Sequence, residues 1–145
     1  MNNDVVIYQS SDGLVKMEAI VDASNETIWA TQKAMAELFG VNVPAISKHL
    51  KNIYSEGELA ESMTISKMET VVQRGFRGAV REMVEFYNLD ATISVGYRIN
   101  SRQATAFRQW ATSVLKQYMI KGYVVNQSAV SEQKYEDLKR ALGLL

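Results

Sequence analysis

Residues 32–53 read QKAMAELFGVNVPAISKHLKNI, and this stretch has the clearest structural pattern in the chain. Apolar residues recur at helical spacing on both sides of Gly40, a residue that suits a turn with a left-handed backbone. Thr31 can cap a first helix, and Pro44 fits the first turn of a second helix. The stretch therefore predicts two helices joined by a short glycine turn: a helix-turn-helix. The second helix would cover 44–53 and end near Ser55 or Gly57.

A helical hairpin buried in a core is the alternative for this stretch, but the small residue Ala36, the pair Gly40-Val41, and Ile46 and Leu50 at these offsets favour a DNA-binding motif. In such a motif the N-terminal part of the second helix reads base edges in the major groove, and the residues that are not needed for packing face the DNA. Those residues are Asn42, Val43, Ala45, Ser47, Lys48, Lys51 and Asn52.

The charges of the chain are unevenly distributed. The 145 residues carry 16 Lys and Arg against 16 Asp and Glu, so the formal net charge is zero. Residues 1–30 hold five acids and one base, whereas residues 91–126 hold five bases and no acid, and residues 38–55 and 70–81 also lack acids. A neutral total is therefore compatible with a basic face for a polyanion such as DNA.

Strand patterns lie on both sides of the helix-turn-helix. Alternating apolar and polar residues, with turn residues between them, predict strands over 5–9, 14–21, 27–30, 69–74 and 79–87. The first two would form an N-terminal β-hairpin and the last two a β-ribbon, although residues 80–85 could alternatively be helical. The ribbon turns at Gly75-Phe76-Arg77-Gly78.

The predicted ribbon has a basic tip. Arg74, Arg77 and Arg81 surround its turn, and a β-ribbon with basic residues at its end can reach DNA phosphates or the minor groove as a wing. Phe76 could act there as a wedge, but we expect it to pack back onto the domain. A solvated basic hairpin with no partner is the alternative.

The C-terminal part predicts helices. Asp90 can cap a short helix that closes at Gly96, and Ser101 can cap a long amphipathic helix that reaches Lys121, with Gly122 as its stop. The aromatic stripe of the long helix is typical of a core rather than of a ligand site. Arg102, Arg108 and Lys116 lie off this stripe and could contact phosphates, as could Arg98. A last helix is predicted over 131–142.

The sequence offers little for catalysis. Cysteine is absent, His49 is the only histidine, and no phosphate-binding loop or nucleophile motif is present. We therefore expect no enzyme activity, no cofactor, no metal and no small-molecule substrate. The start of the chain lacks the pattern of a signal peptide and no apolar run could span a membrane, so a cytoplasmic, nucleoid-associated protein is expected.

Several segments resemble a known family. The stretch from Trp29-Ala30-Thr31-Gln32 through the second helix, together with YNLD at 87–90, VGYRINS at 95–101 and FRQWAT at 107–112, is similar to the RhuM family of bacterial virulence-associated and mobile-element proteins. The last segment also resembles the end of Bro-N domains of phage antirepressors. The resemblance implies an N-terminal DNA-binding domain, and we include Thr31 and Gln32 among the candidate DNA contacts.

Together these patterns predict an α+β fold, namely a winged-helix-like helix-turn-helix domain with an N-terminal β-hairpin, a basic β-ribbon and a long C-terminal amphipathic helix. The DNA-binding domain would span 1–126, and 127–145 would be a linker and a helix for dimerisation or the start of a further domain. The expected function is sequence-specific binding of double-stranded DNA by a homodimer, in transcriptional regulation within a bacterial pathogenicity island or prophage. The alternative is a protein-interaction module, as in an antirepressor or the regulatory head of a fused toxin such as Fic.

Overall fold

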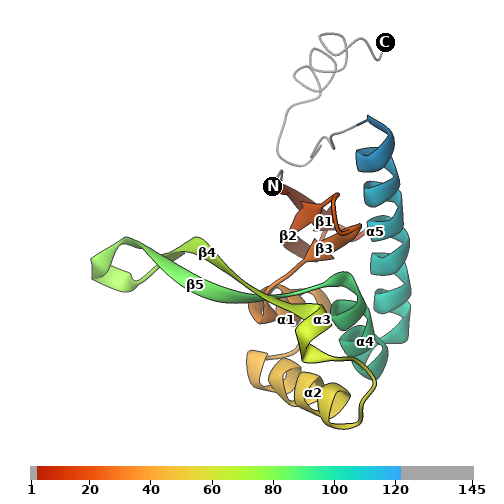
Figure 1. Cartoon of the computed structure of the whole chain (residues 1–145), viewed down its shortest axis with the longest axis horizontal. Coiled ribbons are helices and arrows are strands. Elements are labelled where there is room, and N and C mark those ends of the chain that lie inside the picture. Colours follow the sequence, from red (N-terminus) through yellow and green to blue (C-terminus); the bar gives the residue numbers. More distant parts are fainter. Residues whose placement is uncertain (1–2, 122–145) are drawn as a thin grey trace.

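The computed structural model describes residues 3–121, which form a mixed α+β fold. A body of helices and a small sheet carries one long projecting hairpin (Figure 1). The elements are, in chain order, β1 (Asn3–Gln9), β2 (Lys16–Asp22), β3 (Thr27–Trp29), α1 (Gln32–Phe39), α2 (Val43–Ser55), α3 (Glu61–Thr64), β4 (Ile65–Gln73), the short 3-10 turn η1 (Gly75–Arg77), β5 (Ala79–Tyr87), α4 (Leu89–Ile99) and α5 (Ser101–Lys121).

The N-terminal sheet is antiparallel with the order β1-β2-β3. The strands predicted near residues 5, 14 and 27 are confirmed, although the second begins at Lys16. The alternation along β2 buries Met17, Ala19 and Val21, since successive side chains of a strand point to opposite faces. One face of the sheet therefore forms part of the core.

A buried carboxylate organises the turn between β2 and β3. Asp22 is only 1% exposed and accepts hydrogen bonds from the Ser24 hydroxyl, from the backbone and side-chain amides of Asn25, and from the Trp29 indole at 3.0 Å. Burial by itself raises the pKa of Asp22, but these donors outweigh it and lower the pKa from 3.8 to about 2. The carboxylate is therefore ionised at neutral pH and holds the turn.

The two helices predicted on either side of Gly40 are present as α1 and α2. The Thr31 hydroxyl caps α1 by accepting from the Ala34 amide at 3.1 Å, and Gly40 ends α1 in the left-handed region at φ 68°. The buried residues Ile46 and Leu50 seat α2 on the body, as expected. Helix α2 runs from Val43 to Ser55, so the predicted end near Ser55 is confirmed.

The predicted ribbon is a long antiparallel hairpin of β4 and β5, here called the arm (Ile65–Tyr87). Its register pairs Ile65 with Tyr87 at the base and Gln73 with Ala79 near the tip, so residues 80–85 are strand and not helix. The first strand begins at Ile65 rather than at residue 69. The arm projects away from the body (Figure 1).

The helix predicted over 90–96 is confirmed as α4, but its predicted cap and its predicted end are wrong. The Asn88 side chain, not Asp90, caps α4 by accepting from the Ala91 amide at 3.0 Å, and α4 continues through Gly96 to Ile99. A Cβ at Gly96 would lie 2.5 Å from the Phe39 ring and 2.8 Å from the Ala104 Cβ. This glycine therefore permits close packing inside the helix and does not end it.

The long helix α5 covers the sheet along one side of the body (Figure 1). Asn100 rather than Ser101 caps it, because its side chain accepts from the Gln103 amide at 3.1 Å. The aromatic stripe is core as predicted: Tyr8 packs edge-on against Phe107 and Trp110, with ring centroids 5.4 and 5.1 Å away. The predicted stop at Gly122 and the predicted helix over 131–142 lie outside the described residues.

Candidate functional site

Helix α2 begins with a side-chain cap that the sequence had suggested as a DNA contact. Asn42 has an extended backbone, and its Oδ1 accepts a hydrogen bond from the Ala45 amide at 2.9 Å. Pro44 lies in the first turn, where its missing N–H costs nothing. The Asn42 side chain is exposed, but its oxygen is committed to the helix, and the NH₂ group is the part that can face a ligand.

The outer face of α2 is basic. Lys48 and Lys51 are exposed, and neither forms an ion pair with an acid among residues 3–121. Val43 is 41% exposed at the start of the helix. The other predicted contacts on this helix are half-buried: Ala45, Ser47 and Asn52. The exposed part of α2 thus offers two unpaired ammonium groups beside an apolar side chain.

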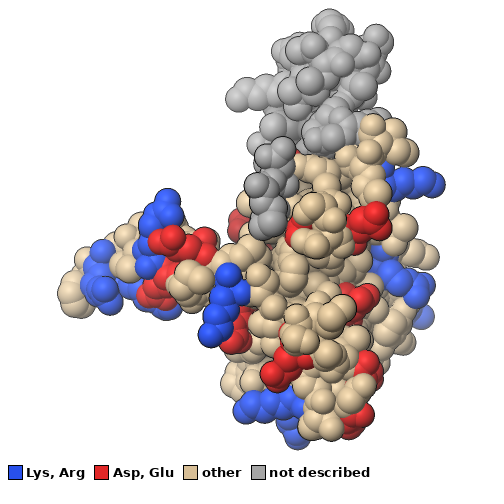
Figure 2. Space-filling view, viewed as in Figure 1, with Lys and Arg blue, Asp and Glu red and all other residues tan. Residues whose placement is uncertain are grey.

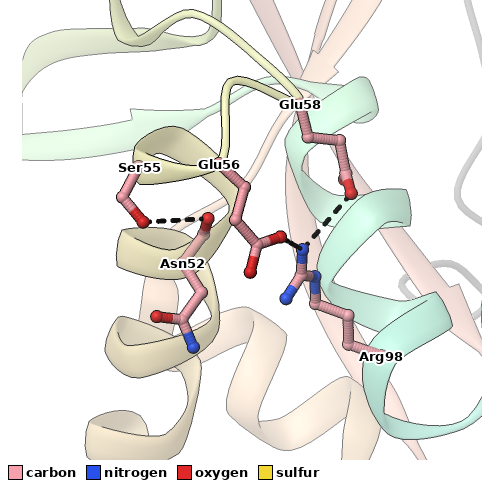
Figure 3. A network of polar contacts seen from close by, with 5 residues as sticks. All are labelled: Asn52, Ser55, Glu56, Glu58 and Arg98. Carbon is pink, nitrogen blue, oxygen red and sulfur yellow. Dashed lines mark hydrogen bonds and ion pairs between the residues drawn. The ribbon is translucent and has the colours of Figure 1, made fainter.

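Arg98 forms ion pairs with two glutamates of the same chain, Glu56 and Glu58 (Figure 3). Its Nη2 lies 2.6 Å from the Glu56 carboxylate and 3.3 Å from that of Glu58, and the two carboxylates raise the pKa of the guanidinium. The Arg98 side chain is 26% exposed. This candidate phosphate contact therefore ties α4 to the segment that follows α2.

The three arginines near the arm tip differ in their partners. Arg74 binds both carboxylate oxygens of Glu82, at 2.8 Å from Nε and 2.5 Å from Nη2, which raises the pKa of Arg74 and lowers that of Glu82. Arg81 lies 3.7 Å from Glu69. Arg77 is exposed and forms no ion pair in the described part of the chain, although at longer range it helps to lower the pKa of Glu82. Arg77 is therefore the arm's most available cation of the three.

The tip itself overturns one expectation. Phe76 does not pack back onto the domain: it is 104% exposed, because the arm carries it away from every other element. Gly75 and Gly78 flank the 3-10 turn with φ values of 55° and 74°, a backbone that other residues rarely adopt. The sequence pattern located the turn correctly but not the direction of its aromatic side chain.

Thr31 and Gln32 serve the junction between α1 and the arm. Thr31 caps α1, as described, and the Gln32 Nε2 donates a hydrogen bond of 2.9 Å to the Tyr87 hydroxyl. That hydroxyl donates in turn to Glu85 at 3.1 Å. Burial, together with the neighbouring Glu85, raises the pKa of Tyr87 to about 12, although the Gln32 bond lowers it. The two predicted contacts are thus half-buried structural residues.

The bases do not converge on one surface. Figure 1 places α5, which carries Arg102, on the side of the body opposite to the arm, which carries Arg77. Figure 2 shows basic side chains over the arm, over α2 and along the α5 side, and acidic side chains are interleaved with them on the arm. Of the other elements that carry predicted contacts, α2 begins on the side of the body from which the arm extends (Figure 1).

A groove at the base of the arm was not predicted from any sequence pattern. It has a volume of about 630 Å³ and lies between the sheet, α1 and the arm, with Lys33, Glu37, Thr70 and Phe86 among its lining. Within residues 3–121 no cluster of three or more His, Cys, Asp or Glu side chains could hold a metal ion, and no helix there is long and apolar enough to cross a membrane.

Comparison with known proteins gives one match. The model of the Virulence protein RhuM family matches residues 63–140. The matched region begins in α3 and includes the arm, α4 and α5, whereas the α1–α2 pair lies before it. No curated protein and no solved structure matches the chain.

Proposed function

The chain belongs to the Virulence protein RhuM family, and from that premise we propose that it is a winged-helix-like module that binds double-stranded DNA sequence-specifically and regulates transcription. Its setting would be a bacterial pathogenicity island or prophage, in the cytoplasm at the nucleoid. Family membership leaves the activity open, so the proposal depends on the α1–α2 pair and the arm.

The observation that carries the proposal is the outer face of α2. The helix is seated on the body through Ile46, Leu50 and Ile53, and the opposite face presents Lys48 and Lys51 without acid partners among the described residues. A helix held in this way after a short turn is the element that enters a major groove in helix-turn-helix proteins. Lysines on its face suit phosphates, while Asn42 and Val43 at its start suit base edges and thymine methyl groups.

The arm would act as the wing. It is joined directly to the residues before α1, since Ala30 and Tyr87 exchange backbone hydrogen bonds of 2.9 and 2.8 Å. Helix α2 begins on the side of the body from which the arm extends (Figure 1). In this arrangement the arm tip, with Arg77, would contact DNA beside the groove that α2 enters, and Arg98 and Arg102 would not take part.

One such module reads a short site, so we propose a homodimer on two half-sites about one helical turn, or ~34 Å, apart. The helix predicted over 131–142 is our candidate for the dimer contact. Light scattering at micromolar concentration tests it, because a monomer would contradict the dimer.

The function is tested by salt-dependent binding. Fluorescence anisotropy with a labelled random-sequence duplex, from about 50 to 200 mM salt, should show affinity that falls steeply with salt. The double variant Lys48→Ala/Lys51→Ala should make the negative slope of log K against log salt shallower by about 1.8, because each lost phosphate contact removes about 0.9.

The matched control removes two bases from α5. Arg102→Ala/Lys116→Ala changes the net charge by the same amount on exposed positions away from the arm. Its slope should stay at the wild-type value. Salt-insensitive binding, absent binding or equal slopes for the two double variants would refute the proposed interface.

A second candidate, a protein-interaction module, is supported by the stem of the arm. Its exposed face mixes charges of both signs and exposes Val71 and Met83, which are 56% and 64% exposed. Acids along this stem disfavour close contact with phosphates. If DNA binding is absent while Val71→Ser/Met83→Ser abolishes association with a protein partner, this second function replaces the first.

A further inference from the structure

The arm tip displays an aromatic side chain that is not packed against any other part of residues 3–121. Phe76 is 104% exposed and stands at the end of two nine-residue strands. An exposed phenyl ring forgoes the favourable burial that aromatic side chains normally provide. Its place at the tip of a projecting element suggests that it is buried against a partner.

The backbone of the tip presents this ring in a fixed manner. The Arg74 amide donates to Gly78 O at 2.9 Å, the Arg77 amide to Arg74 O at 3.1 Å and the Gly78 amide to Gly75 O at 3.0 Å. These bonds close the turn before any partner binds. Gly75 precedes Phe76 and Gly78 ends the turn, so Arg77 is the only other residue with a side chain within the turn 75–78. The tip is thus narrow and preorganised, which lowers the entropic cost of inserting the ring.

The charge around the ring selects the kind of partner. Residues 70–81 contain Arg74, Arg77 and Arg81 and no acid. Arg74 and Arg81 are paired with Glu82 and Glu69, whereas Arg77, next to Phe76, forms no ion pair among residues 3–121 and interacts with Glu82 only at longer range. A protein pocket for Phe76 would need to be apolar with an acidic rim. A DNA duplex offers both features in one structure, since stacked bases lie between two rows of phosphates.

We propose that Phe76 is a wedge that enters between two base pairs of duplex DNA from the minor groove while Arg77 binds an adjacent phosphate. Apolar wedges of this kind partly unstack a base step and kink the duplex toward the major groove. The arm has the necessary reach, because nine residues of strand extend roughly 30 Å, close to one turn of DNA. The inference rests on the proposed DNA binding and adds DNA bending to it.

The test measures bending and binding separately. A duplex of about 30 base pairs with an A·T-rich centre carries a donor and an acceptor dye at its ends, so that bending raises energy transfer. The wild-type chain should raise it. Phe76→Ala should remove the increase and weaken binding about tenfold, the effect of losing one buried aromatic side chain.

Two further variants separate the wedge from charge and from folding. Phe76→Leu keeps an apolar wedge and should retain most of the bend, whereas Arg77→Ala should lower the salt slope by about 0.9 and keep the bend. Since Phe76 makes no contact in the fold, thermal unfolding of Phe76→Ala should match the wild type. A second readout is the linking number of a plasmid that topoisomerase has relaxed in the presence of the protein. Insertion between base pairs untwists DNA and should lower this number.

The outcomes distinguish the wedge from the proposed function. If the wild type binds DNA but neither bends nor untwists it, or if Phe76→Ala bends it equally, the wedge is refuted and DNA binding stands. If the wild type does not bind the duplex at all, both proposals fail. Loss of the bend in Phe76→Ala with its retention in Phe76→Leu supports the wedge.

Discussion

Tyr87 and Ala30 exchange two backbone hydrogen bonds, of 2.8 and 2.9 Å, and join the base of the arm to the residue before the cap of α1. A side-chain bond runs parallel to them, from Gln32 to the Tyr87 hydroxyl. Segments more than fifty residues apart in sequence are thereby fixed together. The direction of the arm is therefore set by the same residues that start the α1–α2 pair.

The first prediction concerns this junction. Tyr87→Phe removes the hydroxyl that accepts from Gln32 and donates to Glu85, and leaves a half-buried amide without its partner. The free energy of unfolding should fall by about 1 kcal/mol. Urea unfolding followed by circular dichroism measures it. Tyr97→Phe is the control, because within residues 3–121 the Tyr97 hydroxyl accepts a hydrogen bond from the exposed Arg108, and its loss should cost less than about 0.5 kcal/mol.

The second prediction concerns pH and Asp22. Its pKa is about 2 in the folded chain against 3.8 in the reference state, so the carboxylate stabilises the fold at pH above about 4. This contribution is lost as the pH falls from about 4 toward 2, because protonation then removes the acceptor. Its full size is roughly 2.5 kcal/mol, from a shift of nearly two pKa units at about 1.4 kcal/mol each.

Asp22→Asn provides the comparison. The free energy of unfolding of the variant should lie below that of the wild type at pH 7, and the gap should narrow steadily toward pH 2. Urea titrations of both proteins at several pH values measure the gap. A gap that stays constant with pH would show that the ionised form of Asp22 does not stabilise the turn.

The third prediction is that Gly96→Ala destabilises the fold, although alanine is the better helix former by about 1 kcal/mol. The added methyl group would meet the Phe39 ring at 2.5 Å and Ala104 at 2.8 Å. Overpacking of this kind costs about 1–3 kcal/mol. Thermal unfolding should show a lower midpoint for Gly96→Ala, while Ser113→Ala, exposed on α5, should leave it unchanged. A raised midpoint for Gly96→Ala would contradict the close packing.

The difference between the predicted and the observed role of Gly96 illustrates what the sequence can and cannot predict. A glycine after an amphipathic run normally signals a helix end, and the same rule located the end of α1 at Gly40 correctly. At Gly96 the rule failed, because glycine is required there by the close approach of the Phe39 ring and not by a helix end. Local patterns predict the caps, turns and core stripes that depend on neighbours in sequence, and they predicted α1, α2, the arm and α5.

The candidate site was predictable to a smaller extent. The exposed positions of Lys48, Lys51 and Arg77 follow from helical periodicity and turn position, and the structure has them exposed. The engagement of Arg98 was not predictable, because Glu56 and Glu58 are some forty residues away in the chain. Phe76 is exposed because the arm projects far from the body. The length of the arm follows from the pairing register of β4 and β5, and composition alone does not predict it.

The last prediction separates the two roles of Asn42, which caps α2 and stands on the proposed DNA face. Asn42→Ala confounds them, since it should cost about 1 kcal/mol of stability through the lost cap. Asn42→Asp keeps the cap and suits the positive end of the helix dipole, so stability should be unchanged. A carboxylate about 4 Å from a phosphate should nevertheless weaken DNA binding by about 1 kcal/mol, roughly fivefold, at low salt. Asn100→Asp at the cap of α5 is the matched control and should bind as the wild type does. Equal affinities for the two aspartate variants would place the DNA away from the start of α2.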